Sequence, residues 1–133
     1  MTEFNDDQKC FVCGQGNPAG LKLHFRPKNS GPEVEADVRF PVHFQGWKDT
    51  VHGGILATVL DEAMVKAATA IGCKCVTAEI TVKYKKPAVT ETAYLLSGSI
   101  LAARGRIITA EGRLCDPSGQ VVAQATGKLF KVE

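Results

Sequence analysis

The chain has 133 residues, of which 44% are hydrophobic and 23% charged, a composition typical of an ordinary globular domain. A domain of this length buries roughly two-thirds of its unfolded surface, which is enough for one hydrophobic core. Sixteen basic against fourteen acidic residues leave a net charge of +2, too small for the broad positive surface of a nucleic-acid-binding protein. We therefore expect a single domain over residues 1–133 with no nucleic-acid partner.

The N-terminal residues and the cysteines favour a soluble, cytoplasmic protein. Residues 1–8 contain three acids and no apolar run, and no uncharged stretch approaches the ~18 residues of a membrane span, so we expect neither a signal peptide nor a membrane partner. An odd number of cysteines favours reduced thiols over a disulfide framework. The cysteines are Cys10, Cys13, Cys73, Cys75 and Cys115. Only the first two form a Cys-x-x-Cys pair, and since a structural zinc site usually has four ligands, we expect packing roles and no metal.

The hydrophobic pattern predicts one helix and about six strands. Residues 21–25 and 33–40 alternate apolar and polar side chains around a proline-containing break, which predicts a β-hairpin. Residues 54–71 have helical periodicity and end before Gly72. Four further strands follow at residues 77–85, 92–103, 106–115 and 121–132, separated by short turns. The order predicts an α+β fold in which a curved antiparallel sheet wraps one long central helix.

Two neighbouring acids lie on different faces of the predicted helix. Glu62 belongs to a polar stripe with Thr58, Lys66 and Thr69 and is expected to be a solvated surface acid. Asp61 lies about 100° away, on a face that is otherwise small or apolar. A carboxylate there loses hydration, so Asp61 either pairs with a buried partner or acts as a catalytic base or nucleophile.

The helix begins with a glycine pair that offers free backbone N–H groups. His52 precedes Gly53 and Gly54, and the positive end of the helix dipole there suits a carbonyl oxygen that gains negative charge. The alternative interpretation is that the two glycines form only a flexible hinge into the helix and bind no ligand. Gly53 and Asp61 are eight residues apart, about 12 Å along a helix, too far to act on one carbonyl. A complete site therefore requires two copies packed about a two-fold axis, Asp61 of each facing Gly53 of the other.

These residues resemble a known family. The segments His52-Gly53-Gly54, Asp61-Glu62 and residues 77–88 (TAEITVKYKKPA) look like those of the hotdog-fold acyl-CoA thioesterases, including the phenylacetate-pathway and 4-hydroxybenzoyl-CoA types. Residues 10–21 and 116–123 are also similar to members of that superfamily. The resemblance implies a hotdog fold, dimers or dimers of dimers joined edge to edge, and an acyl-CoA bound between subunits. It implies no cofactor beyond the coenzyme A of the substrate.

The resemblance also assigns roles by position. Asp61 matches the acid that activates water or attacks the thioester, and Gly53 the residue whose N–H polarises its carbonyl. His52 matches a histidine near the thioester, and Thr77 a hydroxyl residue that helps to position water. Some relatives have Asn or Gln six residues before the His-Gly pair, where this chain has Gly46, so either Gln45 takes that role or the role is absent.

Further residues are candidates for contacts with the substrate. Gly54 allows close approach at the helix start, and Trp47 either lines an acyl pocket or closes the end of the core. Five cations are either solvated edge residues or contacts for CoA phosphates. They are Lys83, Lys85, Lys86, Arg104 and Arg106.

Two other functions compete with hydrolysis. Residues 43–46 (His-Phe-Gln-Gly) resemble part of a motif of hotdog β-hydroxyacyl dehydratases, but its prolines are missing and Asp61 lies about one helical turn too late. A non-catalytic acyl-CoA-binding module is the second alternative. A binding module needs neither the acid nor the glycine pair, so thioester hydrolysis is the favoured prediction.

Overall fold

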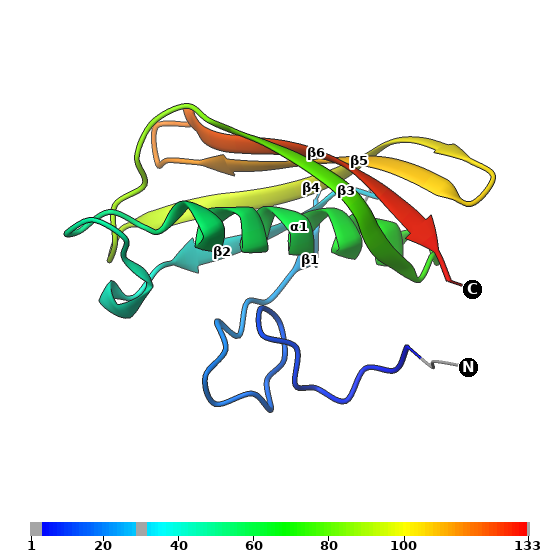
Figure 1. The fold of residues 1–133 in the computed structure, drawn as a ribbon, viewed down its shortest axis with the longest axis horizontal. Helices are drawn as coiled ribbons and strands as arrows, with labels where there is room; N and C mark the ends of the chain where they lie inside the picture. The colour runs from blue at the N-terminus through cyan, green and yellow to red at the C-terminus, as the bar shows by residue number, and fades with distance from the viewer. Residues whose placement is uncertain (1–3, 29–31, 133) are drawn as a thin grey trace.

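The computed structural model describes residues 4–28 and 32–132, and in these ranges one α-helix lies against one face of a six-stranded antiparallel sheet (Figure 1). This confirms the predicted α+β architecture. The elements are β1 (Arg26–Pro27), β2 (Val34–Arg39), the 3-10 turn η1 (Val42–Phe44), α1 (Gly53–Ala70), β3 (Cys75–Tyr84), β4 (Ala93–Arg104), β5 (Ile107–Cys115) and β6 (Val121–Lys131). No described helix is long and apolar enough to cross a membrane.

The strands follow the order β1-β2-β4-β5-β6-β3, with every neighbouring pair antiparallel. The ten-residue strand β3 therefore lies at an edge, and within the described residues it pairs only with β6. A long strand with one unpaired side presents backbone N–H and C=O groups to a further strand.

The predicted first strand is wrong. Residues 21–25 form no strand, and the strand that pairs with β2 is the two-residue β1 that follows them. The backbone N–H groups of Leu21 and Leu23 instead donate to the carbonyls of Phe11 and Val12, so they are not available to a sheet. Lys22 has a φ of 54°, which is incompatible with a regular strand. The predicted break around residues 27–32 falls partly on residues 29–31, outside the described ranges.

The core lies between α1 and the sheet. One face of the helix is fully covered, and this face comprises Leu56, Val59, Leu60, Ala63, Met64, Ala67 and Ala68. The helix approaches β4 so closely that a Cβ at Gly98 would lie 2.1 Å from the Ala63 carbonyl oxygen. The opposite side of α1 is covered by the N-terminal segment, residues 4–25 (Figure 1). The turn of α1 that holds Asp61 is thus fixed between two layers.

Candidate active site

The start of α1 has one backbone N–H free for a ligand. The His52 Nδ1 atom accepts a hydrogen bond from the Gly54 N–H at 2.9 Å and caps the helix. The Tyr84 hydroxyl donates to the Gly53 carbonyl at 2.8 Å and ties the helix to the end of β3. No residue in the described ranges accepts a hydrogen bond from the Gly53 N–H. Of the two glycine N–H groups at the helix start, that of Gly53 is therefore free and that of Gly54 is bonded to the capping His52 side chain.

Asp61 and Thr77 are brought together from α1 and β3. The Thr77 hydroxyl donates to Asp61 Oδ1 at 2.5 Å, and both residues are half-buried. A carboxylate with one oxygen held in this way has a fixed orientation, while its other oxygen accepts nothing from the described residues. The arrangement leaves that oxygen available to a water molecule or a reacting carbon.

Asp61 and Gly53 do not meet within one chain. Both belong to the uninterrupted 18-residue helix, so the rise of about 1.5 Å per residue separates them by roughly 12 Å along its axis. This is the separation on which the two-copy hypothesis depends.

A hollow of about 500 Å³ opens beside the helix start, and it includes His52 and Gly53. Trp47, whose surface is 87% exposed, lies on its rim. Trp47 therefore does not close the end of the core. The Gln45 side-chain oxygen accepts the Asp49 N–H at 3.0 Å, so it holds the preceding loop in shape.

The candidate cations separate into two groups along the molecule. Lys83 and Lys85 are exposed at the end of β3, near the start of α1. Arg104 and Arg106 are exposed at the β4–β5 hairpin, beyond the opposite end of the helix (Figure 1). One chain does not gather all of these charges at one place.

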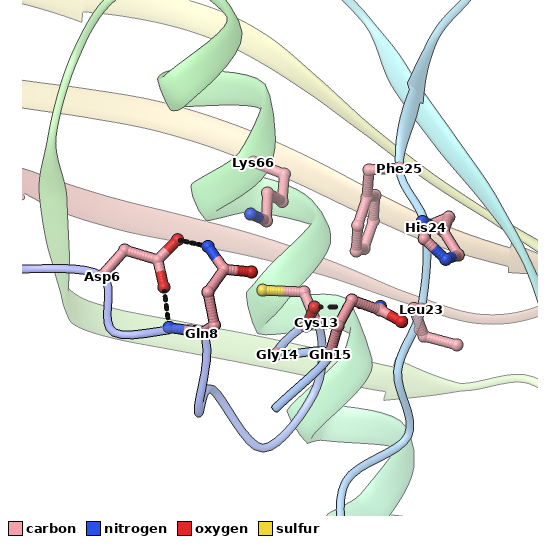
Figure 2. A pocket seen from close by; sticks show the side chains of 9 residues that line it. All are labelled: Asp6, Gln8, Cys13, Gly14, Gln15, Leu23, His24, Phe25 and Lys66. Carbon is pink, nitrogen blue, oxygen red and sulfur yellow. Dashed lines mark hydrogen bonds between the residues drawn. The ribbon is translucent and has the colours of Figure 1, made fainter. Parts of the chain in front are cut away.

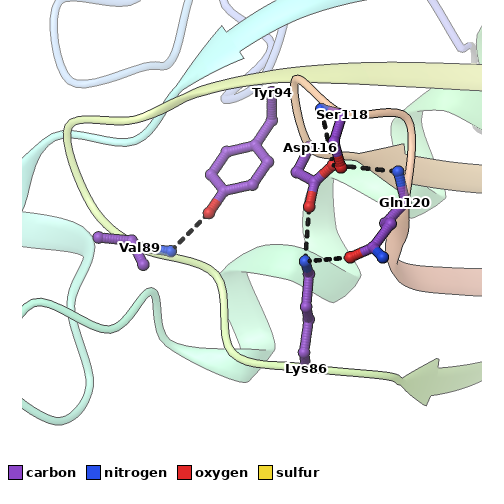
Figure 3. Close-up of polar contacts among 6 residues, drawn as sticks. All are labelled: Lys86, Val89, Tyr94, Asp116, Ser118 and Gln120. Carbon is purple, nitrogen blue, oxygen red and sulfur yellow. Dashed lines mark hydrogen bonds and ion pairs between the residues drawn. The ribbon is translucent and has the colours of Figure 1, made fainter.

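Lys86 is held in an ion pair. Its ammonium contacts Asp116 at 2.5 Å and Gln120 at 2.9 Å, which joins the end of β3 to the β5–β6 turn (Figure 3). The hydrogen bond from Lys86, followed by that from Ser118, holds the pKa of the Asp116 carboxyl well below its usual range. A nearby hydrogen bond from the Val89 N–H to the Tyr94 hydroxyl, at 2.8 Å, fixes the following loop (Figure 3).

Glu62 is not the solvated acid that the helical pattern predicted. It is half-buried because the N-terminal segment covers it, and the Cys10 thiol donates to its Oε2 atom at 3.6 Å. Burial, followed by hydrogen bonds with Glu62 and Cys10, raises the pKa of the Cys13 thiol to about 12. A thiol of such high pKa is a poor nucleophile at neutral pH, which argues against Cys13 as a catalytic nucleophile. The structure contains all five cysteines as free thiols.

Two polar contacts were not predicted from the sequence. Tyr84 was expected only to form part of a strand. Its hydroxyl contacts the Gly53 carbonyl, and a tyrosine at the end of a strand that packs beside the helix start could have indicated this. The contact of Glu62 with Cys10 had no local signal because the two residues are 52 positions apart.

Comparison with known proteins identifies the family. The sequence model of the thioesterase superfamily matches residues 48–123, which include α1, β3, β4 and β5. A crystal structure of a thioesterase superfamily protein superposes with a TM-score of 0.87 and 27% identity. The match covers 93% of this chain but only 60% of that protein. No match was found among curated proteins.

Two further solved structures share the hotdog fold at lower identity. One is a hypothetical thioesterase from Streptococcus pneumoniae, solved with coenzyme A (TM-score 0.76, 17% identity, 83% of this chain and 88% of that chain). Two variants of it replace an aspartate and a threonine by alanine, at positions whose numbers differ by 16. The other is the Escherichia coli PaaI protein from the phenylacetic acid degradation operon (TM-score 0.77, 14% identity, 85% and 81%).

Proposed function

This chain belongs to the thioesterase superfamily, and from that premise we propose that it hydrolyses an acyl-CoA thioester to the free acid and the thiol. The contact between Thr77 and Asp61 is the observation that supports this most directly, because it orients a half-buried carboxylate on a helix face that is otherwise small or apolar. Asp61 and Thr77 are 16 positions apart, the same interval as the aspartate and threonine replaced in the pneumococcal relative.

In the proposed reaction the thioester carbonyl oxygen accepts a hydrogen bond from the Gly53 N–H. As an oxygen nucleophile adds to the carbonyl carbon, negative charge develops on the carbonyl oxygen, and the positive end of α1 stabilises it. The carbon–sulfur bond then breaks, and the coenzyme A sulfur leaves as a thiolate that takes up a proton.

The attacking oxygen comes from water deprotonated by Asp61 or from the Asp61 carboxylate itself. The second route forms an acyl-aspartate anhydride that water then hydrolyses. A single turnover in isotopically labelled water identifies the anhydride route when water opens the anhydride at the Asp61 carboxyl carbon. The first product then carries an unlabelled oxygen from Asp61 and the label enters Asp61, whereas direct attack by water labels the product and leaves Asp61 unlabelled.

The second copy is proposed to dock at the free edge of β3. Antiparallel pairing of β3 with the same strand of a partner would extend the sheet across a two-fold axis and turn the two helices in opposite directions. Asp61 of one copy would then approach Gly53 of the other. The same operation would bring the partner's β4–β5 hairpin, with Arg104 and Arg106, toward Lys83 and Lys85 to meet CoA phosphates.

A panel of acyl-CoA thioesters with a thiol-detecting reagent tests the proposal. The wild type should release thiol from at least one class of acyl-CoA, and Asp61→Ala should lose on the order of 10²- to 10⁴-fold in kcat. Asp37→Ala is the matched control, since its side chain is 81% exposed on β2, and should retain activity. Thermal stabilisation by acyl-CoA without thiol release would instead identify a binding module.

A further inference from the structure

The N-terminal Cys-x-x-Cys turn holds its first sulfur in a polar backbone cradle. The Cys10 Sγ atom accepts the N–H groups of Val12 at 3.4 Å and Cys13 at 3.5 Å. The Gly14 N–H closes the turn on the Cys10 carbonyl at 2.9 Å. A Cβ at Gly14 would lie 2.4 Å from the Cys10 nitrogen, so the turn requires glycine there. The two N–H contacts and the tight turn fix the position of the Cys10 sulfur, one of the two soft ligand atoms that the Cys-x-x-Cys turn offers.

A third ligand comes from the helix. Glu62 Oε2 lies 3.6 Å from Cys10 Sγ, and the ligand atoms of Cys10, Cys13 and Glu62 all lie within 4.8 Å of one another. In a tetrahedral zinc site with Zn–S near ~2.3 Å and Zn–O near ~2.1 Å, sulfur and oxygen ligands are about 3.6 Å apart. The distance between Cys10 and Glu62 already has this value. All three residues are half-buried.

We propose that Cys10, Cys13 and Glu62 bind one zinc-type divalent cation, with water at the fourth tetrahedral position. This departs from the sequence-based expectation of no metal, because the helix supplies a ligand that no local motif indicates. Binding releases the two thiol protons to solvent and leaves three negative ligands around a charge of +2.

The remaining negative charge has a nearby counter-charge. Lys66 lies one helical turn after Glu62, and Figure 2 shows its ammonium and the Cys13 sulfur directed into the same pocket of about 290 Å³ between α1 and the N-terminal segment. The Lys66 ammonium offsets the excess negative charge of the ion and its three ligands, and Asp6 is the one other acid among the described residues that line this pocket. Offsetting that excess lowers the cost of placing the ion in a half-buried position.

The cation would join the N-terminal segment, residues 4–25, to α1. The segment 4–25 has no regular strand or helix, so it contacts α1 only through loop residues. A metal bridge from Cys10 and Cys13 to Glu62 would fasten this segment to the turn of α1 that bears Asp61. Residues 61 and 62 project about 100° apart, so the ion would act as a structural clamp and would not touch the reacting carboxylate.

Metal analysis of the full chain tests this proposal independently of catalysis. Purified under a non-chelating reductant, loaded with Zn²⁺ and dialysed, the wild type should retain one zinc per chain. With Co²⁺ as the only added metal it should show thiolate-to-cobalt charge-transfer absorption. Cys10→Ser and Cys13→Ser should each weaken binding by at least about 100-fold, whereas Cys115→Ser, which alters a cysteine at the end of β5, should bind as the wild type does.

Two further variants keep both thiols. Glu62→Gln should weaken zinc binding and preserve the charge-transfer band, because the thiolates remain. Gly14→Ala retains all three ligands but breaks the turn, and it should also bind zinc more weakly. The proposal is overturned if the wild type shows no charge-transfer band, or if Cys13→Ser and Glu62→Gln bind zinc as tightly as Cys115→Ser. Since the wild-type band is itself decisive, the test stands even if a serine variant fails to fold.

Discussion

The Thr77 hydroxyl donates a 2.5 Å hydrogen bond to the Asp61 carboxylate and so links the edge strand β3 to the helix. The bond fixes one carboxylate oxygen, and the other accepts no hydrogen bond from the described residues. It also places the catalytic candidate beside the strand edge at which a second copy is proposed to dock. The position of the carboxylate thus depends on a residue that does not itself need to touch the substrate.

Thr77→Val should lower kcat with little change in KM, because it removes the bond that orients Asp61 and leaves substrate contacts in place. A hydrogen bond to a charged group contributes about 1.5–3 kcal/mol, which corresponds to roughly 10- to 100-fold in rate. Thr77→Ser retains the hydroxyl and should restore most of the activity. Steady-state kinetics of both variants decide the role, and equal losses in the two would show that the hydroxyl does not position Asp61.

Gly53→Ala should fold normally and lose activity. An added Cβ would meet the Tyr84 ring at 3.6 Å, an ordinary contact, and alanine favours helix more than glycine does. In the proposed reaction the thioester carbonyl must reach the Gly53 N–H, and the added methyl group would narrow the space beside it, so kcat/KM should fall by about tenfold or more. Thermal denaturation and kinetics are measured on the same preparation. Unchanged kcat/KM at unchanged stability would remove Gly53 from the site.

The ion pair between Lys86 and Asp116 predicts a pH-dependent contribution to stability. The pKa of Asp116 is lowered in the folded state, so its stabilising effect is fully present above the unfolded value of about 3.9 and is lost as the pH falls through the folded value. Lys86→Met should therefore reduce the free energy of unfolding near pH 7, and the difference from the wild type should shrink below about pH 4.

Urea denaturation across this pH range measures that difference. Lys85→Met is the matched control, since Lys85 is exposed and forms no ion pair with the described residues. A deficit of Lys86→Met that stayed constant down to strongly acidic pH would mean that the pair with Asp116 is not its cause.

Hydrophobic periodicity was sufficient to locate the helix and the later strands. The helix was expected at residues 54–71 and lies at Gly53–Ala70, because one continuous face had to be buried against the sheet. The prediction of a first strand at residues 21–25 was wrong because it depended on side-chain burial alone. Its alternating residues do bury Leu23, but their backbone groups pair with the N-terminal loop. Side-chain alternation reports burial on one side and does not reveal the hydrogen-bond partner.

From residue spacing alone, and apart from the family resemblance that also singled out Thr77, the site was predictable only where its residues share one element. Gly53 and Asp61 stand out because both lie on the helix, and their spacing could be converted into a distance. The pairing of Asp61 with Thr77 depends on how β3 crosses the helix, and the burial of Glu62 depends on a loop 52 residues earlier in the chain. Such contacts are determined by tertiary packing, which a helical sequence pattern does not predict.

Mixing two inactive variants tests the shared site most directly. Asp61→Ala lacks the carboxylate, and Gly53→Pro lacks the N–H donor while remaining compatible with the first position of a helix. Each alone should be inactive, but heterodimers formed by subunit exchange should contain one intact site, giving about a quarter of wild-type activity in an equal mixture. No recovery of activity in a mixture whose subunits have demonstrably exchanged would contradict the account.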